Sequence, residues 1–276
     1  MTRPIKAAIG RIVFASHVNE LLLRQVAVVV AFHRVDEAPD ACGLSIDPAM
    51  FERYCRFFQR HFHVISLRAL IGKLERGEQL NRHLAITFDD GYRDNFDHAA
   101  AVLERLGLPA TFFVVSQWIG SDIVPWWDRE QNVRRPWMTW DQVRSLRRRG
   151  FDIGAHTRTH ADLGQVSGAD AQDEILGGRL ELERRLGEPV DLFAYPYGGR
   201  DNFVEANRDL VRAAGFRCCC SCYGGVTYAD GDPFCLPRVP VSPWYGSPHQ
   251  FGLELLPMKP LSARLSRLTA FSPVSA

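Results

Sequence analysis

The run Val26-Ala27-Val28-Val29-Val30-Ala31-Phe32 contains no polar residue. A strand that faces water on one side alternates apolar and polar residues, whereas a strand covered on both sides reads as a continuous apolar run. The run is also far shorter than the roughly 20 residues that a membrane-spanning helix needs. It therefore predicts a buried strand of a parallel sheet.

Six further apolar runs, each bounded by charged or turn residues, recur along the chain. They cover Leu84–Phe88, Thr111–Val115, Phe151–Ala155, Val190–Tyr195, Phe216–Cys220 and Leu236–Val241. Helical patterns lie between most of them, such as the one that Asp47 and Pro48 open. About seven such strands alternating with helices predict an α/β fold, an irregular (β/α) barrel of about seven parallel strands.

A chain of 276 residues has the size of one such barrel domain. We expect an N-terminal extension at 1–24, the barrel at 25–245 and a peripheral tail at 246–276, with a weakly amphipathic stretch at 262–268. The first apolar stretch is interrupted by Arg11 and no clear cleavage site follows it, so we expect no signal peptide.

Charge and cysteine usage narrow the class of protein further. The 33 basic and 32 acidic residues give a formal net charge of +1, so we expect a neutral substrate and no nucleic acid. Seven cysteines, four of them within 218–222, fit a disulfide framework poorly and favour a reducing, cytoplasmic compartment. We expect no transmembrane segment, while peripheral membrane attachment through the N-terminal segment stays open.

Polar groups follow five of the predicted strands. They are His33, the pair Asp89-Asp90, His156, the segment Pro196-Tyr197-Gly198, and Arg238 close to the last run. The loops at the carboxyl ends of the strands form the active site of a (β/α) barrel, so these groups should meet at one rim.

Asp89 and Asp90 are adjacent carboxylates, and like charges this close cannot both ionise freely unless a cation compensates them. If one of them binds a metal ion, the other is free to take a proton from water as a general base. The alternative is a structural Asp-Asp-Gly turn that caps the next helix.

His156 and His160 are four residues apart, and this spacing brings two imidazoles within reach of one ion. The spacing alone is a weak signal. Together with Asp90, it predicts a centre for one divalent transition metal with an open coordination position, and hence a metal-dependent hydrolase.

These motifs resemble those of the NodB-homology polysaccharide deacetylases, carbohydrate esterase family 4. The similarity covers roughly residues 25–245 and rests on T-F-D-D-G-Y at 87–92, H-T-x-T-H at 156–160 and F-A-Y-P-Y-G at 193–198. The resemblance implies a distorted (β/α) barrel that removes the N-acetyl group of an amino sugar in a polysaccharide or lipid-linked glycan. It also implies that Asp89 is the general base, that Asp90, His156 and His160 hold the metal, usually zinc, and that the Tyr197 backbone N–H helps form the oxyanion hole.

The chain departs from the family pattern at two places. Ala194 stands where the family commonly has an arginine that binds the catalytic aspartate, and we expect Arg238 to supply this guanidinium, the alternative being a surface ion pair. The histidine that protonates the departing amine is not obvious. His249 is a weak candidate, and His33 sits at a strand end.

Three residues are assigned to substrate binding: His33, Tyr92 and Trp127. Trp126 and Trp127 lie in a long connection where they would stack on a sugar face or, alternatively, pack the loop onto the barrel. Two other functions stay open, hydrolysis of a different amide such as a formamido sugar, and glycan binding with little or no turnover.

Overall fold

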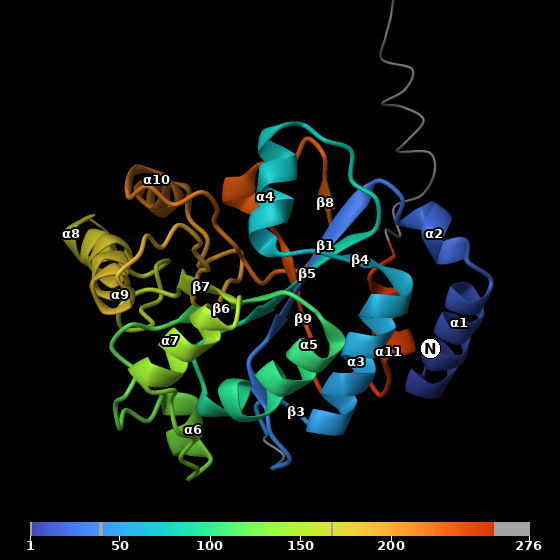
Figure 1. Ribbon diagram of the computed structural model, residues 1–276, viewed down its shortest axis with the longest axis horizontal. Coiled ribbons are helices and arrows are strands. Elements are labelled where there is room, and N and C mark those ends of the chain that lie inside the picture. Colours follow the sequence, from blue (N-terminus) through green and yellow to red (C-terminus); the bar gives the residue numbers. More distant parts are fainter. Residues whose placement is uncertain (1, 39–40, 167, 257–276) are drawn as a thin grey trace, which may run out of the picture.

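The computed structural model describes residues 2–38, 41–166 and 168–256. A mostly parallel seven-stranded sheet runs through its centre, with helices packed around it (Figure 1). Four parallel strands lie side by side in the order β7 (Asp152–Ala155), β6 (Ala110–Val114), β5 (His83–Phe88) and β1 (Val26–Phe32). The short strands β4 (His63–Val64), β8 (Thr227–Tyr228) and β9 (Arg238–Pro240) complete the sheet, and only β8 is antiparallel. Every residue of β1 is buried, as its sequence predicts.

Three isolated parallel bridges continue the sheet beyond β7. They join Ala155 to Phe193, Ala194 to Cys220, and Cys220 to Leu236. Leu236 precedes β9, which pairs with β1 and so leads back to the start of the sheet. The predicted strands at 190–195 and 216–220 are therefore single bridges rather than full ladders. The prediction of an irregular (β/α) barrel is confirmed, although its ring of continuous strands is not closed.

Helices cover the outside of the sheet. The α-helices are α1 (Arg3–Ala15), α2 (Val18–Leu22), α3 (Pro48–His61), α4 (Leu67–Glu75), α5 (Ala100–Leu106), α6 (Trp126–Glu130), α7 (Trp140–Arg148), α8 (Gly168–Gln172), α9 (Gly178–Leu186), α10 (Glu205–Ala213) and α11 (Pro248–Glu254). Shorter elements are β2 (Arg34–Val35), β3 (Ser45–Ile46), and the helical turns Asn95–Ala99, Asp173–Gly177 and Pro233–Cys235. Asp47 caps α3 by accepting from two backbone N–H groups. Among the described residues, no helix is both long and apolar enough to cross a bilayer.

The two ends of the described chain meet, because α1 packs against α11. Gly10 permits this contact, since a Cβ atom there would lie 2.1 Å from the His249 carbonyl oxygen. Residues 248–254 of the expected tail thus form a helix on the domain, while the stretch 262–268 lies outside the described residues. His61 of α3 lies in the aromatic cluster under α1, with its ring centroid 4.9 Å from those of Phe14 and Phe57.

The position of His61 predicts a pH-dependent stability. Burial, followed by the charges of Arg60 and His249, lowers the pKa of His61 to about 4. The unfolded chain takes up this proton near pH ~6.5, so we expect the free energy of unfolding to fall as the pH drops from about 6.5 to about 4. Because the ring is only partly buried, its share should be about 1–2 kcal/mol. Urea unfolding across this pH range should show the loss. His61→Phe should reduce the loss by that share and leave the part due to His83 and His249, whose pKa values burial also lowers, while the exposed His98→Phe control should keep the whole loss.

Candidate metal centre

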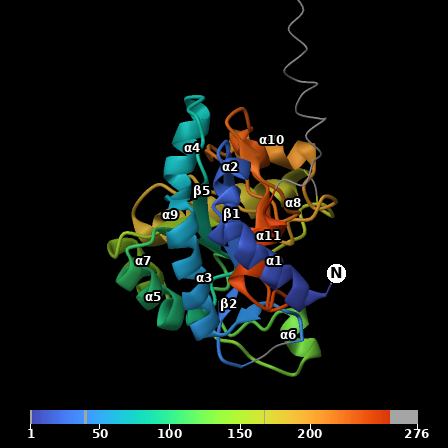
Figure 2. The same cartoon turned by 90° about the vertical axis from the view of Figure 1, so that its right-hand side faces the viewer.

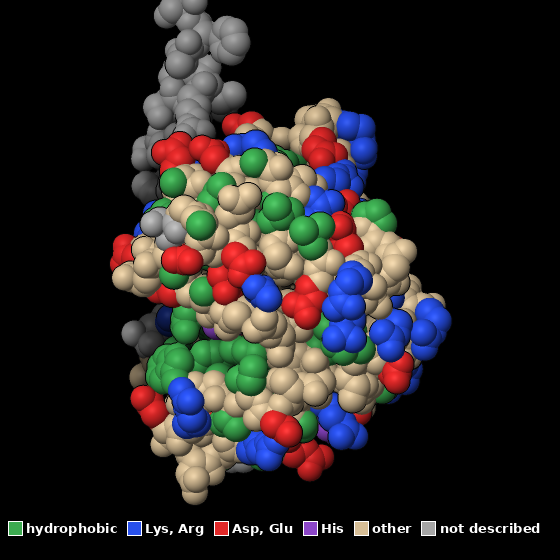
Figure 3. All heavy atoms as spheres, turned by 90° about the vertical axis from the view of Figure 1, so that its left-hand side faces the viewer, with side chains coloured by type: hydrophobic (Ala, Val, Ile, Leu, Met, Phe, Trp, Pro, Cys, Tyr) green, Lys and Arg blue, Asp and Glu red, His purple; other side chains and the backbone are tan. Residues whose placement is uncertain are grey.

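A cavity of about 330 Å³ opens at the carboxyl ends of β1, β5 and β7. Its lining combines polar and aromatic groups: His33, Cys42, Leu44, Asp89, Asp90, Trp126, Trp127, His156, His160, Tyr195, Tyr197, Cys222 and Pro240. Figure 3 shows hydrophobic side chains gathered beside a hollow in the lower part of one face. A mainly apolar cavity with a few convergent polar groups is typical of small-molecule sites.

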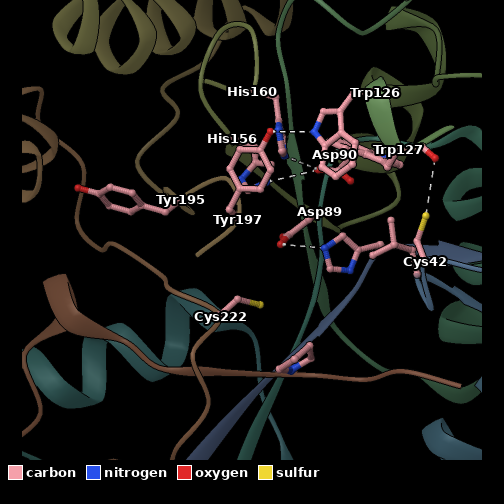
Figure 4. Close-up of a pocket in the computed structure, with 13 residues that line it drawn as sticks. Cys42, Asp89, Asp90, Trp126, Trp127, His156, His160, Tyr195, Tyr197 and Cys222 are labelled. Carbon is pink, nitrogen blue, oxygen red and sulfur yellow. Dashed lines mark hydrogen bonds and ion pairs between the residues drawn. The ribbon is translucent and has the colours of Figure 1, made fainter. Parts of the chain in front are cut away.

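Asp90, His156 and His160 converge at the base of this cavity (Figure 4). All three side chains are buried. Asp90 Oδ1 lies 3.4 Å from His156 Nε2 and 3.3 Å from His160 Nε2, and one ligand atom of each residue lies within 4.8 Å of the others. The metal-ligand trio expected from sequence is thus brought together in space.

The distances within the trio fit a shared metal ion. Bonds of about 2.0–2.2 Å arranged tetrahedrally place neighbouring ligand atoms about 3.3–3.6 Å apart. Asp90 Oδ1 is buried and accepts no hydrogen bond from any described residue. His156 Nδ1 donates to the Ala194 carbonyl oxygen at 2.8 Å, which leaves the Nε2 lone pair directed to the centre. One carboxylate and two imidazoles suit a divalent transition metal such as zinc.

Backbone strain is concentrated around these residues. Of the seven non-glycine residues with positive φ in the described chain, four belong to the site: Asp90 (71°), Thr157 (62°), His160 (65°) and Tyr197 (61°). Asp90 and Tyr197 are each central to a three-residue turn closed by a backbone hydrogen bond, from Gly91 to Asp89 and from Gly198 to Pro196. Such conformations cost about 1–3 kcal/mol each. The turn at Asp90 lets two adjacent carboxylates enter one cavity and bind different partners.

Asp89 binds Arg238 rather than the histidines. The Arg238 guanidinium donates to both carboxylate oxygens, at 2.6 and 2.7 Å, and also to Thr87 Oγ1 and the Ser221 carbonyl oxygen. Both charged groups are buried. Burial raises the pKa of Asp89, but the charges of Arg238 and His156 outweigh it and hold that pKa below its usual range. Asp89 is therefore an ionised and firmly oriented carboxylate beside the trio.

The remaining residues expected at the site take different positions. His33 lines the cavity, with Nε2 4.0 Å from Asp89 Oδ2. The Tyr197 backbone N–H donates to no other described residue, so it is free for a ligand. His249 lies outside the cavity, in α11, with its ring 5.2 Å from that of Phe57.

The structure corrects the assignment of Tyr92 to substrate contact. Its side chain is fully buried and does not line the cavity, because its hydroxyl accepts hydrogen bonds from Arg34 at 2.8 Å and from Trp127 Nε1 at 3.0 Å. Trp127 reaches the cavity but is 9% exposed, so it mainly packs the loop, while Trp126 is 49% exposed. Trp126 is the indole with a free face for a ligand.

Two supporting groups were not predicted from sequence. The Trp118 ring stacks on His160 at 4.9 Å with an interplanar angle of 21°. Arg34 forms a buried ion pair with Asp128 of α6 at 2.5 Å, which fixes the helix that carries both tryptophans. Nothing in the local sequence of Trp118 signals its contact with a histidine so distant in the chain.

Several known proteins are similar in sequence to this chain. A sequence model described as "Polysaccharide deacetylase" matches residues 76–219. The protein YxkH of Bacillus subtilis (strain 168), whose name assigns it to the polysaccharide deacetylases, is 27% identical over 174 residues, 63% of this chain and 56% of its own. A poly-β-1,6-N-acetyl-D-glucosamine N-deacetylase of Escherichia coli (strain K12) is 26% identical over 47% of this chain and 20% of its own. The chain thus spans little more than half the length of the first relative and a fifth of the second.

One solved structure has a fold similar to that of this chain. The deacetylase PplD of Streptococcus pyogenes, in complex with acetate, superposes with a TM-score of 0.70 over 86% of this chain and 100% of its own. The two sequences are 18% identical, so this likeness bears on the fold alone.

Proposed function

The chain belongs to the polysaccharide deacetylase family, and from that premise we propose that it hydrolyses the N-acetyl group of an amino sugar in a polysaccharide or lipid-linked glycan. The reaction releases acetate and uses one divalent metal ion, for which zinc is the family's usual choice. The observation that carries the proposal is the buried trio Asp90, His156 and His160 beside an ionised Asp89 in one cavity. The name of the Escherichia coli relative supports an N-acetylated amino sugar as substrate.

An ion held by Asp90, His156 and His160 would supply Lewis acidity toward the amide carbonyl and the attacking water. Asp89 takes a proton from that water as the oxygen bonds to the acetyl carbon, and Arg238 keeps its carboxylate ionised and oriented. The Tyr197 backbone N–H donates to the developing oxyanion. The C–N bond then breaks, and the nitrogen leaves as an amine once it receives a proton.

His33 is the proton donor to the departing nitrogen. It is the third imidazole lining the cavity, and the other two are assigned to the ion. His33→Ala should lower kcat by about 10²–10⁴-fold with metal content unchanged, the range typical of a lost general acid. The exposed His98→Ala variant serves as a control, and a rise in KM at constant kcat would instead make His33 a substrate contact.

Acetate release from N-acetylglucosamine oligomers by the metal-loaded protein tests the proposal. Acetate release that exceeds formate release from matched formamido sugars supports an N-deacetylase. Faster formate release would favour the alternative amide substrate. Oligomer binding without release of either acid would favour a glycan-binding relative. Each measurement needs the metal-free protein as a blank.

A further inference from the structure

The N-terminal helices expose an apolar ridge. Five of the eleven large hydrophobic side chains exposed in the described chain belong to α1 and α2: Ile5, Ile9, Ile12, Val18 and Leu21. Ile12 is 68% exposed and Leu21 is 63% exposed. Scattered exposed hydrophobic residues are ordinary, but a group of this kind on two consecutive helices marks an interaction surface. We call these five residues the N-terminal ridge.

The ridge is not needed to hold α1 on the domain. Gly10 and Phe14, the buried residues of α1, face α11 and the aromatic cluster. Ile5, Ile9 and Ile12 are spaced by four and three residues, so they share a stripe on the other side of the helix. The helix thus has one apolar side for the fold and a second one that faces out.

Positive charge gathers next to α1, and most of it has no carboxylate partner among the described residues. A cavity of about 550 Å³ between α1, α3 and α11 is lined by Arg11, Arg53, Arg56 and Arg60. Across the described residues, no carboxylate lies within 4.0 Å of a basic group of Arg3, Arg11, Arg24, Arg53 or Arg60. The acidic residues of these helices already have partners, since Glu254 binds Lys6, Glu20 binds Arg82, and Glu52 binds Arg56 and Arg105.

We propose that this face docks on the surface of an anionic lipid bilayer, with the N-terminal ridge at the level of the headgroups and acyl chains and the arginines on lipid phosphates. Figure 2 looks onto the face, where α1 and α2 stand in front with α3 and α11 beside them. An apolar stripe flanked by arginines is the combination that lets a helix lie in a membrane interface. The proposal is independent of the hydrolytic function.

Two other possible partners of the ridge, the C-terminal residues and a second copy of the chain, have the wrong charge. The C-terminal residues 257–276 contain Lys259, Arg264 and Arg267 and no acidic side chain, so they would bring more positive charge to a basic surface. A second copy docked around a two-fold axis would bring two copies of the same basic surface together. An anionic bilayer satisfies both the apolar and the basic groups.

Vesicle flotation of the full chain tests whether the N-terminal ridge contributes to lipid binding. The protein should float with vesicles of mixed phosphatidylglycerol and phosphatidylcholine, and much less with phosphatidylcholine alone. The triple variant Ile5→Ser, Ile9→Ser, Ile12→Ser should bind the mixed vesicles at least about tenfold more weakly. Leu180→Ser alters a leucine of α9 that is 55% exposed, within the range of the three isoleucines, and this control should bind as wild type. The Tm of each variant checks that it is folded.

The double variant Arg53→Glu, Arg60→Glu tests whether the arginines contribute to lipid binding. Each arginine near an anionic surface contributes about fivefold to binding, so affinity for the mixed vesicles should fall about twentyfold or more. Arg148→Glu, on the exposed side of α7, is the matched control. Equal binding to both kinds of vesicle, or wild-type binding by the ridge and arginine variants, would overturn the proposal. Self-association in solution that the triple variant abolishes would also overturn it in favour of a second copy.

Discussion

Asp90→Asn should leave the protein almost free of metal, whereas the wild type should hold about one ion per chain at the trio. The substitution keeps the shape of the side chain but removes the charge of the one anionic residue among the three proposed ligands. Loss of a partner outside the ligand set typically costs 10–100-fold in affinity, so loss of this ligand should cost at least about 100-fold. Metal analysis after dialysis, together with an anomalous scattering signal, measures the content and locates the ion.

Thermal unfolding gives a second measure of the same centre. A ligand that binds only the folded state at about 1,000 times its Kd stabilises it by about 4 kcal/mol, so a chelator should lower the Tm of the wild type. The chelator should not change the Tm of Asp90→Asn, while His98→Ala should respond as the wild type does. Full metal content in Asp90→Asn, or an ion located elsewhere, would refute the ligand assignment.

The sheet was largely predictable because its long strands are buried on both faces. Val26–Phe32 carries this signal most clearly, and the structure has the same bounds for β1. The runs at 190–195 and 216–220 were predicted as strands, yet they pair only through single bridges. Burial in an irregular barrel wall produces the same apolar run as a full ladder does, so the sequence cannot tell these two cases apart. Two-residue strands such as β4 have no periodicity to detect.

The placement of the site residues followed from one rule, that strand ends meet at one rim. The rule brought Asp90 and His156 together and placed Arg238 beside Asp89, although the roles of these residues stay predictions. The rule does not predict which side chains at the strand ends point into the cavity. Tyr92 was assigned to the substrate from sequence, but its contacts with Arg34 and Trp127 hold its side chain away from the cavity lining.

Contacts made by loop residues away from the strand ends were beyond prediction. Trp118 meets His160 because the loop after β6 is hydrogen-bonded to residues 157 and 158, just before His160. The strained turn at Asp90 depends on tertiary packing as well, since an isolated Asp-Asp-Gly segment has easier conformations. Sequence patterns describe local preference, and the site is where tertiary structure overrides it.

Asp89→Asn should abolish nearly all turnover while the metal stays bound. An amide cannot take a proton from water near neutral pH, and loss of a general base costs about 10²–10⁴-fold in kcat. Because Asp89 is not one of the three proposed ligands, metal content should remain near one ion per chain. Acetate release and metal analysis on the same preparation separate this result from that of Asp90→Asn, which should lose both.

Stability needs its own control in this experiment, because Asp89→Asn leaves the buried Arg238 guanidinium without its counter-charge. Breaking a buried ion pair from one side costs about 3–5 kcal/mol, so a drop in Tm alone would reduce activity in the assay. The double variant Asp89→Asn, Arg238→Met removes both charges, and replacement of a whole buried pair by apolar groups is often neutral. It should regain Tm without regaining turnover. Recovery of both would mean that Asp89 supports the fold and that another group accepts the proton from water.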